Sequence, residues 1–343
     1  MIKRLFVTFL FLILFTTVSF SQKNDTLVHI NGNIITGEIK KIENGILYFS
    51  TNGMGTINVE TDKVKSLKSG KEFQILLDNG LLYFGSLDTV NGTEAKTRII
   101  SHNRIYIIKT ISLVEVFPIK NTFWLRTSGD FSIGGNYTKS TEILQLNFAG
   151  NLYYRGKKNY FQISWNNQIT TYQDSVLSEK TTNTISYRRY IKKHYSMQAV
   201  VGASSNLELN LNNRMYLNLT AGKDIIHTNM SIFYTGLGLS ANKEIYTDTT
   251  KNSNNLEGIF TVTYNFFKRT DPEINIKSYI DTYPSFTQPG RWRIDASLEV
   301  RVELFNNFYV GASFYDNFDN SATLESDQHN DWGINGTITY SFH

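Results

Sequence analysis

The 343-residue chain contains no cysteine and only four prolines. Without cysteine there can be no disulfide framework, no thiol nucleophile and no lipid-modified cysteine. The net charge of +4 falls to +2 if Lys3 and Arg4 are removed with the start of the chain, and so small a charge argues against nucleic acid as a partner. The mean hydropathy of −0.27 argues against a helical membrane protein, which needs long apolar runs. A membrane β-barrel remains compatible with this value, because half of each of its strands is polar.

The start of the chain has the three parts of a secretory signal peptide. Met1–Arg4 is basic, Leu5–Val18 is strongly apolar, and Ser19–Ser21 offers small residues at the cleavage positions. The alternative is an uncleaved helical anchor, but the apolar part is short and no basic stop follows it. We therefore predict a signal peptide over residues 1–21 and a mature protein that begins at Gln22.

The segment from Thr26 to Pro118 contains an internal repeat. Asn31-Gly32 recurs 48 residues later as Asn79-Gly80, and Asn44-Gly45 recurs 47 residues later as Asn91-Gly92. Asn-Gly between alternating apolar residues is a strong hairpin signal, because both central residues of the turn need positive φ. The repeat predicts two small β modules within residues 22–118, similar to SH3-like or Sm-like barrels.

Two features of these modules could indicate a ligand. Six lysines make the first module basic: Lys40, Lys41, Lys63, Lys65, Lys68 and Lys71. We interpret them as a solvated face, with an envelope polymer or protein as an alternative partner of residues 22–118. His29 and His102 lack metal-ligand spacing and are expected to be solvated or locally hydrogen-bonded.

Phe117–Asn121 is predicted to be the linker, because Pro118 interrupts a hydrogen-bond ladder.

Beyond Phe123 the chain becomes a series of alternating segments. In Arg291–Phe305 the even-numbered residues are apolar, and the odd-numbered ones are mostly charged. Successive residues of a strand point to opposite faces of the sheet, so this segment has one lipid-like face and one charged face. The charged residues are the candidates for a polar lumen, where they could pair: Arg291, Arg293, Asp295, Glu299, Arg301 and Glu303.

The final segment, Asp331–His343, ends like the last strand of a bacterial outer-membrane barrel. Its apolar face contains the candidate signal for the barrel-assembly machinery: Trp332, Ile334, Ile338, Tyr340 and Phe342. The expected partners in transit are this machinery and periplasmic chaperones. Together with this one, twelve segments alternate: 124–136, 142–154, 161–170, 182–190, 195–206, 215–222, 229–242, 256–267, 273–283, 291–305, 308–316 and 331–343.

The connections between these segments alternate in length. Those on the predicted periplasmic side are short, and the outer ones include the longer polar stretches Gln173–Thr181, Thr247–Asn255 and Asp316–Asn330. Short periplasmic turns and long external loops are typical of outer-membrane barrels. We predict an all-β protein of a Gram-negative cell: an antiparallel transmembrane β-barrel of about 12 strands over residues 119–343, in outer-membrane lipid, preceded by two small β modules in the periplasm.

Several motifs resemble the domain of unknown function 481 family, described as salt-induced outer-membrane proteins. They are Ile133-Gly134-Gly135-Asn136, Ser186-Tyr187-Arg188-Arg189-Tyr190, and Gly236-Leu237-Gly238 with Glu244 just beyond. The resemblance covers roughly Trp124 to Phe342. It implies an outer-membrane barrel and no established activity.

The chemistry of an enzyme is not evident in the sequence. In the predicted barrel only His329 reaches the outer rim, beside Ser326, Asp327 and Asp331, and geometry rather than proximity in sequence defines a catalytic triad. The acidic loop near Asp316 lacks the twelve-residue spacing of a calcium loop. We expect no catalytic, cofactor-binding or metal residues and no nucleic-acid partner. The favoured role is a non-enzymatic, structural or envelope-maintenance barrel; the alternatives are a narrow pore for small solutes and an outer-membrane lipid hydrolase.

Overall fold

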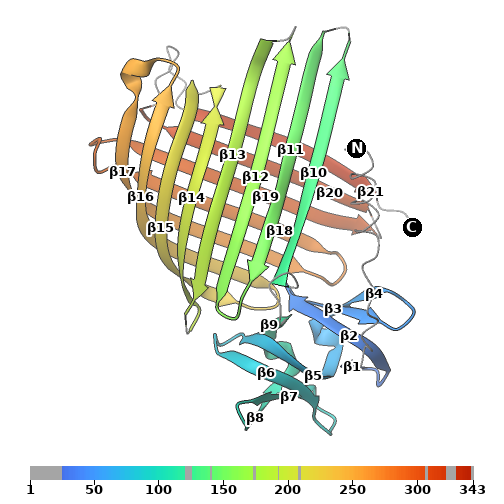
Figure 1. The fold of residues 1–343 in the computed structure, drawn as a ribbon. Helices are drawn as coiled ribbons and strands as arrows, with labels where there is room; N and C mark the ends of the chain where they lie inside the picture. Colours follow the sequence, from blue (N-terminus) through green and yellow to red (C-terminus); the bar gives the residue numbers. More distant parts are fainter. Residues whose placement is uncertain are drawn as a thin grey trace, which may run out of the picture.

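The computed structural model describes residues 25–119, 126–139, 141–172, 175–191, 193–207, 210–305, 308–321 and 330–340. The predicted signal peptide, residues 1–21, lies outside these ranges. Within them the protein is built of strands and short 3-10 turns arranged in two antiparallel sheets (Figure 1). No helix in the described ranges is long and apolar enough to cross a membrane.

The first sheet contains nine strands in the order β4-β3-β2-β1-β5-β6-β7-β8, with β9 paired to β2 and β5. Their bounds are β1 (Asp25–His29), β2 (Ile34–Glu43), β3 (Ile46–Thr51), β4 (Thr56–Glu60), β5 (Val64–Leu77), β6 (Leu82–Thr89), β7 (Lys96–Ser101), β8 (Arg104–Lys109) and β9 (Leu113–Pro118). Two 3-10 turns, Thr61–Lys63 and Thr110–Ser112, precede β5 and β9.

The internal repeat is confirmed by the strand register. Leu27 lies opposite Ile35 in β2, and 48 residues later Ile75 lies opposite Tyr83 in β6. The two loops that connect these strand pairs also make equivalent bonds: the amide of Gly32 donates to His29 O at 2.9 Å, and the amide of Gly80 donates to Leu77 O at 2.9 Å. Two copies of one strand–turn plan therefore make up this sheet.

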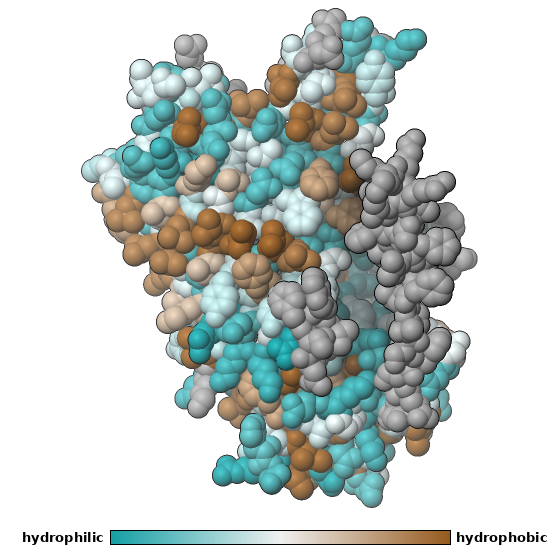
Figure 2. Space-filling view, in the orientation of Figure 1, coloured by the Kyte–Doolittle hydropathy of each residue, from teal (hydrophilic) through white to brown (hydrophobic). Residues whose placement is uncertain are grey.

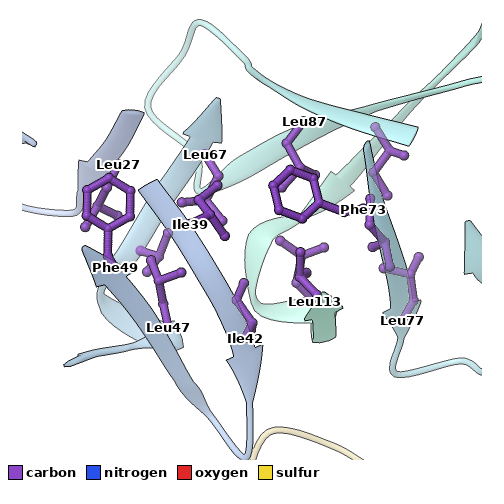
Figure 3. Close-up of a cluster of buried hydrophobic side chains, with 14 residues drawn as sticks. Leu27, Ile39, Ile42, Leu47, Phe49, Leu67, Phe73, Leu77, Leu87 and Leu113 are labelled. Atoms are coloured by element: carbon purple, nitrogen blue, oxygen red, sulfur yellow. The ribbon is translucent and has the colours of Figure 1, made fainter. Parts of the chain in front are cut away.

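The two copies are joined more closely than two separate modules would be. The first half of the 14-residue strand β5 pairs with β1 and closes the first copy, and its second half pairs with β9 and belongs to the second copy. Fourteen fully or nearly fully buried apolar residues from both copies form a single core, with Phe49 and Phe73 its largest members (Figure 3). The predicted linker was partly wrong, because Phe117 and Pro118 are the last residues of β9. Pro118 is tolerated there because it ends the strand.

The second sheet contains twelve strands, the number predicted, paired in sequence order from β10 to β21. They are β10 (Thr127–Thr138), β11 (Ile143–Arg155), β12 (Asn159–Tyr172), β13 (Ser175–Tyr190), β14 (Tyr195–Asn206), β15 (Leu211–His227), β16 (Ser231–Tyr246), β17 (Ser253–Lys268), β18 (Ile274–Pro284), β19 (Trp292–Phe305), β20 (Phe308–Asp319) and β21 (Asn330–Tyr340). The predicted loop Gln173–Thr181 is largely strand, because β13 already begins at Ser175, and the end of the predicted loop Thr247–Asn255 is strand, because β17 begins at Ser253.

One face of this sheet is apolar across its strands. Residues opposite each other in a ladder share a face. Leu298 of β19 lies opposite Phe314 of β20, which lies opposite Ile334 of β21. In the other direction the same face continues to β10, and its exposed members include Phe131, Ile133, Leu146, Phe148, Leu152, Ile185, Met197, Val201, Met215, Leu217, Leu219, Leu237, Leu239, Phe260 and Ile280. Figure 2 shows part of this outer face as a band of hydrophobic residues across the strands.

The other face is polar and concave, because the sheet curls on itself (Figure 1). Lys180 in β13 and Asp331 in β21 are eight strands apart in the sheet order, yet Lys180 Nζ lies 3.4 Å from Asp331 Oδ2. Among the described residues, β10 and β21 are the two edges of the sheet and do not pair with each other. We call the concave side the inner face.

The first sheet docks against one end of the curled sheet (Figure 1). Asn229, in the β15–β16 turn, donates from Nδ2 to Ile111 O at 2.7 Å and to Leu113 O at 3.1 Å. Arg269, in the β17–β18 turn, donates from Nε to Asn44 O at 3.2 Å. Both turns belong to the set predicted to be short and on the periplasmic side, so these turns meet the domain formed by β1–β9.

The face assignment predicts opposite sensitivities for two neighbouring residues of β19. If the outer face contacts hydrocarbon, Leu298→Arg should lower the free energy of unfolding by about 2–4 kcal/mol, because it places a charge at mid-strand in lipid. Ser297→Arg, on the inner face, should have a much smaller effect. Urea unfolding of the protein folded into phosphatidylcholine bilayers would measure both, and equal losses would contradict the assignment.

Candidate functional site: a buried charge network

A network of buried charges lies on the inner face, at the end of the sheet far from β1–β9. Glu244 is near the end of β16, Glu257 near the start of β17, Arg291 just before β19 and Arg293 within it. Glu244 and Glu257 are fully buried, and Arg291 and Arg293 are 3% and 5% exposed. Antiparallel pairing brings the end of one strand beside the start of the next, and the curl of the sheet then brings β16 and β17 to the loop before β19.

Arg291 is held by two carboxylates. Its Nη1 and Nη2 donate to Glu244 at 2.9 and 3.2 Å, while Nε and Nη2 donate to Asp319 at 3.1 and 2.6 Å. Burial works against the charged form, but the hydrogen bonds to Asp319 and Glu244 outweigh it and hold the pKa of Arg291 above its usual range. Arg214 adds a fourth charge, donating from Nε to Glu244 Oε1 at 2.7 Å.

Arg293 forms a second, parallel centre. Its Nε and Nη2 donate to the two oxygens of Glu257 at 3.0 and 2.5 Å, a bidentate geometry that suits a guanidinium and a carboxylate. Its guanidinium also lies 4.5 Å from the centre of the Tyr283 ring. Asn255 links the two centres, since its Nδ2 donates to Asn242 Oδ1 at 3.0 Å and to Glu244 Oε2 at 3.1 Å, and Asn242 in turn donates to Glu257 at 2.8 Å.

The arrangement is suited to holding strands together and to filling space. A buried charge is costly unless it is paired and hydrogen-bonded, and each of these four buried charges has at least one partner of opposite sign. The hydrogen bonds described above join carboxylates, guanidiniums and amides, and none of them activates a hydroxyl by a histidine. The geometry is therefore suited to linking the strands through ion pairs, and we call this arrangement a cross-strand lock.

The six predicted lumen residues separate into two groups. Arg291 and Arg293 belong to the network, and Asp295 lines a cavity of about 360 Å³ beside it. Glu299, Arg301 and Glu303 lie further along β19, outside the network. Glu299 is 53% exposed and only 3.8 Å from Lys277 Nζ, and Arg301 lies 4.4 Å from the centre of the Tyr309 ring.

The residues of the predicted C-terminal signal share the outer face. Trp332, Ile334, Ile338 and Tyr340 are all more than half exposed. Phe342 lies outside the described residues, as do His329 and its neighbours Ser326 and Asp327. His29 and His102 have the local bonds expected of them: His29 Nδ1 accepts from the Asn31 amide, and His102 Nδ1 is 3.1 Å from Ser101 Oγ.

The basic character of the first module is largely cancelled. Lys40, Lys41, Lys63 and Lys71 lie within 4 Å of carboxylates of Glu38, Glu43, Asp62 and Asp25. Four of the six lysines are therefore paired within the domain. This reduces the support for an anionic polymer as its ligand.

Sequence reasoning missed the acidic half of the network. Glu244, Glu257 and Asp319 were not among the candidates, although each lies on the polar side of its strand. A signal existed: Glu244 and Glu257 flank the β16–β17 loop, and the pairing places them on the same face of the sheet, four positions apart along the ladder. What the sequence could not indicate is that the curl of the sheet brings Arg291 and Arg293 to them.

The fold and its polar interior define an all-β protein whose main part is a twelve-stranded antiparallel sheet with an apolar outside and a charged inside. The model of the family described as "Protein of unknown function, DUF481" matches residues 131–342. The chain belongs to this family, as its motifs suggested. Comparison with curated proteins gave no match, and comparison with solved structures gave none either.

The network predicts strong coupling between Arg293 and Glu257. Arg293→Met should lower the free energy of unfolding by about 3–5 kcal/mol, because it leaves Glu257 charged, buried and without its bidentate partner. Arg293→Met combined with Glu257→Gln should recover most of this loss. Urea unfolding of the two single variants and the double variant would give the coupling energy. Additive losses would contradict a lock between these residues.

Proposed function

We propose that this protein is a non-enzymatic outer-membrane β-barrel with a periplasmic domain formed by β1–β9, and that it has a structural or envelope-maintenance role. The observation that carries the proposal is the apolar outer face that continues through all twelve strands while the inner face stays polar. Soluble monomers rarely expose contiguous apolar patches beyond a few hundred Å². Lipid is the environment in which such a face is stable, with the charges kept inside.

The orientation follows from the docking of the two parts. The short turns lie against β1–β9, and in outer-membrane barrels short turns are periplasmic. The domain formed by β1–β9 would then lie at the periplasmic end of the barrel, where an envelope polymer or protein could reach it. The exposed aromatic and aliphatic residues of β21 are the part offered to the barrel-assembly machinery.

The proposal requires the two edges of the sheet to meet. Unpaired backbone groups in hydrocarbon cost several kcal/mol each, so a membrane sheet has no open edge. In the bilayer, β10 would pair with β21 and close the barrel.

Because the chain has no cysteine, closure can be tested by introduced pairs. We expect Ser132→Cys in β10 to form a disulfide with a cysteine at one of the inner positions Gly333, Asn335 or Thr337 of β21. Ser132→Cys with Ala149→Cys, which are direct partners in the sheet, is the positive control. Ser313→Cys in β20, one strand further away, should not react. Oxidation of the protein in lipid followed by mass spectrometry would give the result, and no link to β21 would mean an open sheet.

The favoured role needs a lumen that does not conduct. The buried network occupies the end of the interior opposite the periplasmic domain, and small barrels are normally filled by their own side chains. A specific feature favours the second candidate, a narrow pore: the cavity of about 360 Å³ next to the network is lined by polar residues that include Lys180, Asp281 and Asp295.

Planar-bilayer recording separates the two candidates. We expect the purified wild-type protein to show no discrete conductance steps. Replacing Glu244, Glu257, Arg291 and Arg293 together by alanine removes the network without changing the net charge, and should produce ohmic steps. The control variant combines Glu299→Ala with Arg301→Ala, a charge-neutral inner pair outside the network, and should show no conductance steps. Steps in the wild-type protein would contradict a plugged barrel and favour the pore.

A further inference from the structure

A second polar cluster lies at the junction between the two sheets. His194 is in the turn between β13 and β14, and Asp224 and His227 are near the end of the neighbouring strand β15. Their side chains are 11%, 18% and 7% exposed. The buried charge network at the other end of the sheet uses none of them.

The three side chains converge through their ligand atoms. His227 Nδ1 lies 2.9 Å from Asp224 Oδ2, and His194 Nδ1 lies 4.0 Å from the same oxygen. One potential ligand atom from each residue falls within 4.8 Å of the other two. In a tetrahedral zinc site with bonds of about 2.0–2.1 Å, ligand atoms are about 3.3 Å apart, so the observed separations bracket the required one.

One of these ligand atoms has no role in the metal-free arrangement. Among the described residues, the buried Nδ1 of His194 has no hydrogen-bond partner. Buried polar atoms in proteins are nearly always satisfied, and an exception calls for an explanation such as an ion. The turn itself is also unusual, because Lys193 and His194 have φ of 60° and 65°, where Asn and Gly are the usual residues.

The opposite nitrogen of each imidazole faces a polar group of the domain formed by β1–β9. His194 Nε2 lies 3.3 Å from Asp78 O, and His227 Nε2 lies 3.6 Å from Glu115 Oε1. Glu115 is itself fixed by Arg155 Nη2 at 2.7 Å. Histidines that bind metals typically donate their other N–H to a carboxylate or a backbone carbonyl, which orients the ring. Both kinds of partner are present here.

A close contact of the backbone fixes the position of His194. A Cβ added to Gly80 would lie 2.3 Å from Cδ2 of the His194 ring, so only glycine lets the Asn79-Gly80 turn approach this ring. A similar contact is made in the first copy of the repeat, at the other Asn-Gly turn, where a Cβ added to Gly45 would lie 2.4 Å from Asn229 O. Two turns of the first sheet thus pack against two turns of the second.

From this geometry we propose that His194 Nδ1, Asp224 Oδ2 and His227 Nδ1 form a binding site for a divalent transition-metal ion of the zinc type. Two imidazoles and one carboxylate are donors that suit zinc and its neighbours rather than magnesium or calcium. Three protein ligands leave one position for water. Because Asp78 and Glu115 orient the two rings, the bound ion strengthens the attachment of the periplasmic domain to the rim of the sheet. This inference does not depend on whether the lumen conducts.

The test uses the untagged full-length protein and Co²⁺, a spectroscopic probe for zinc sites. We expect one equivalent of Co²⁺ to bind and to give visible absorption bands that Zn²⁺ removes. His194→Gln and Asp224→Asn should each weaken binding at least about 100-fold. His102→Gln, a histidine change in the domain formed by β1–β9, should leave it unchanged. Glu115→Gln should weaken binding about 10–100-fold, as loss of an orienting partner does.

A second measurement needs no variant and therefore does not depend on the folding of any. Diethyl pyrocarbonate modification followed by mass spectrometry should show that Zn²⁺ protects His194 and His227, while His29 and His102 react equally with and without the ion. Absence of stoichiometric Co²⁺ binding, equal binding by the His194→Gln variant, or no protection by Zn²⁺ would overturn the site. In that case the cluster is an ion pair of His227 between Asp224 and Glu115.

Discussion

The structure depends on one constraint: residues that pair across neighbouring strands lie on the same face of the sheet, from the first strand to the last. In a sheet of period two, a slip of one residue between any two strands would exchange apolar and polar faces from that strand onward. Leu298, Phe314 and Ile334 are successive partners across three strands, and the same face continues to Phe131 in β10. The outer face is kept in this way across twelve strands, and the register shifts only at local β-bulges. A sheet with so uniform an apolar side needs either a second layer or lipid.

The same constraint puts the charges where they need partners. With the outer face apolar, each inward Arg, Asp or Glu must be satisfied within the curl. At the end far from β1–β9, Glu244, Glu257, Arg291 and Arg293 are buried and paired with opposite charges. Toward the other end, Glu299 and Lys277 are more than half exposed and only loosely associated. The interior therefore changes along the strands from a locked end to an accessible one, and the locked end is what a non-conducting barrel requires.

Much of the fold could be predicted because its signals are local. Alternation predicts strands and their faces, and Asn-Gly pairs predict turns, so the twelve strands and the 48-residue repeat were found. Strand ends were less accurate: the polar residues of Gln173–Thr181 suggested a loop, but cross-strand pairing extends β13 back to Ser175. The double use of β5, which joins the two copies, could not be predicted, because hairpin spacing says nothing about it.

The two polar clusters show what local patterns miss. In an unbroken strand, Asp224 and His227 would point to opposite faces, because they are three residues apart. A β-bulge at Ile225 inserts one residue, so that Asp224 lies opposite Tyr234 and His227 opposite Ile232, both on the inner face. His194 joins them from the adjacent turn, and two of the acidic partners of Arg291 and Arg293, Glu244 and Glu257, come from strands three and two places away. Bulges, and contacts that depend on the curl of the sheet, are invisible to a pattern of period two.

The junction combines both kinds of information. The Asn-Gly pairs were recognised as turn signals, and the positive φ of Gly45 and Gly80 agrees with that role. Yet the same glycines also lie close to the second sheet, at Asn229 and at the His194 ring. A side chain at either position would strain the turn and separate the two parts of the protein. Each copy of the repeat therefore supplies one turn, from a different position of the repeat, and each turn meets a different short turn of the curled sheet. This explains how a small domain can be held in one orientation by a few contacts, and why the histidine at one of them is so closely confined.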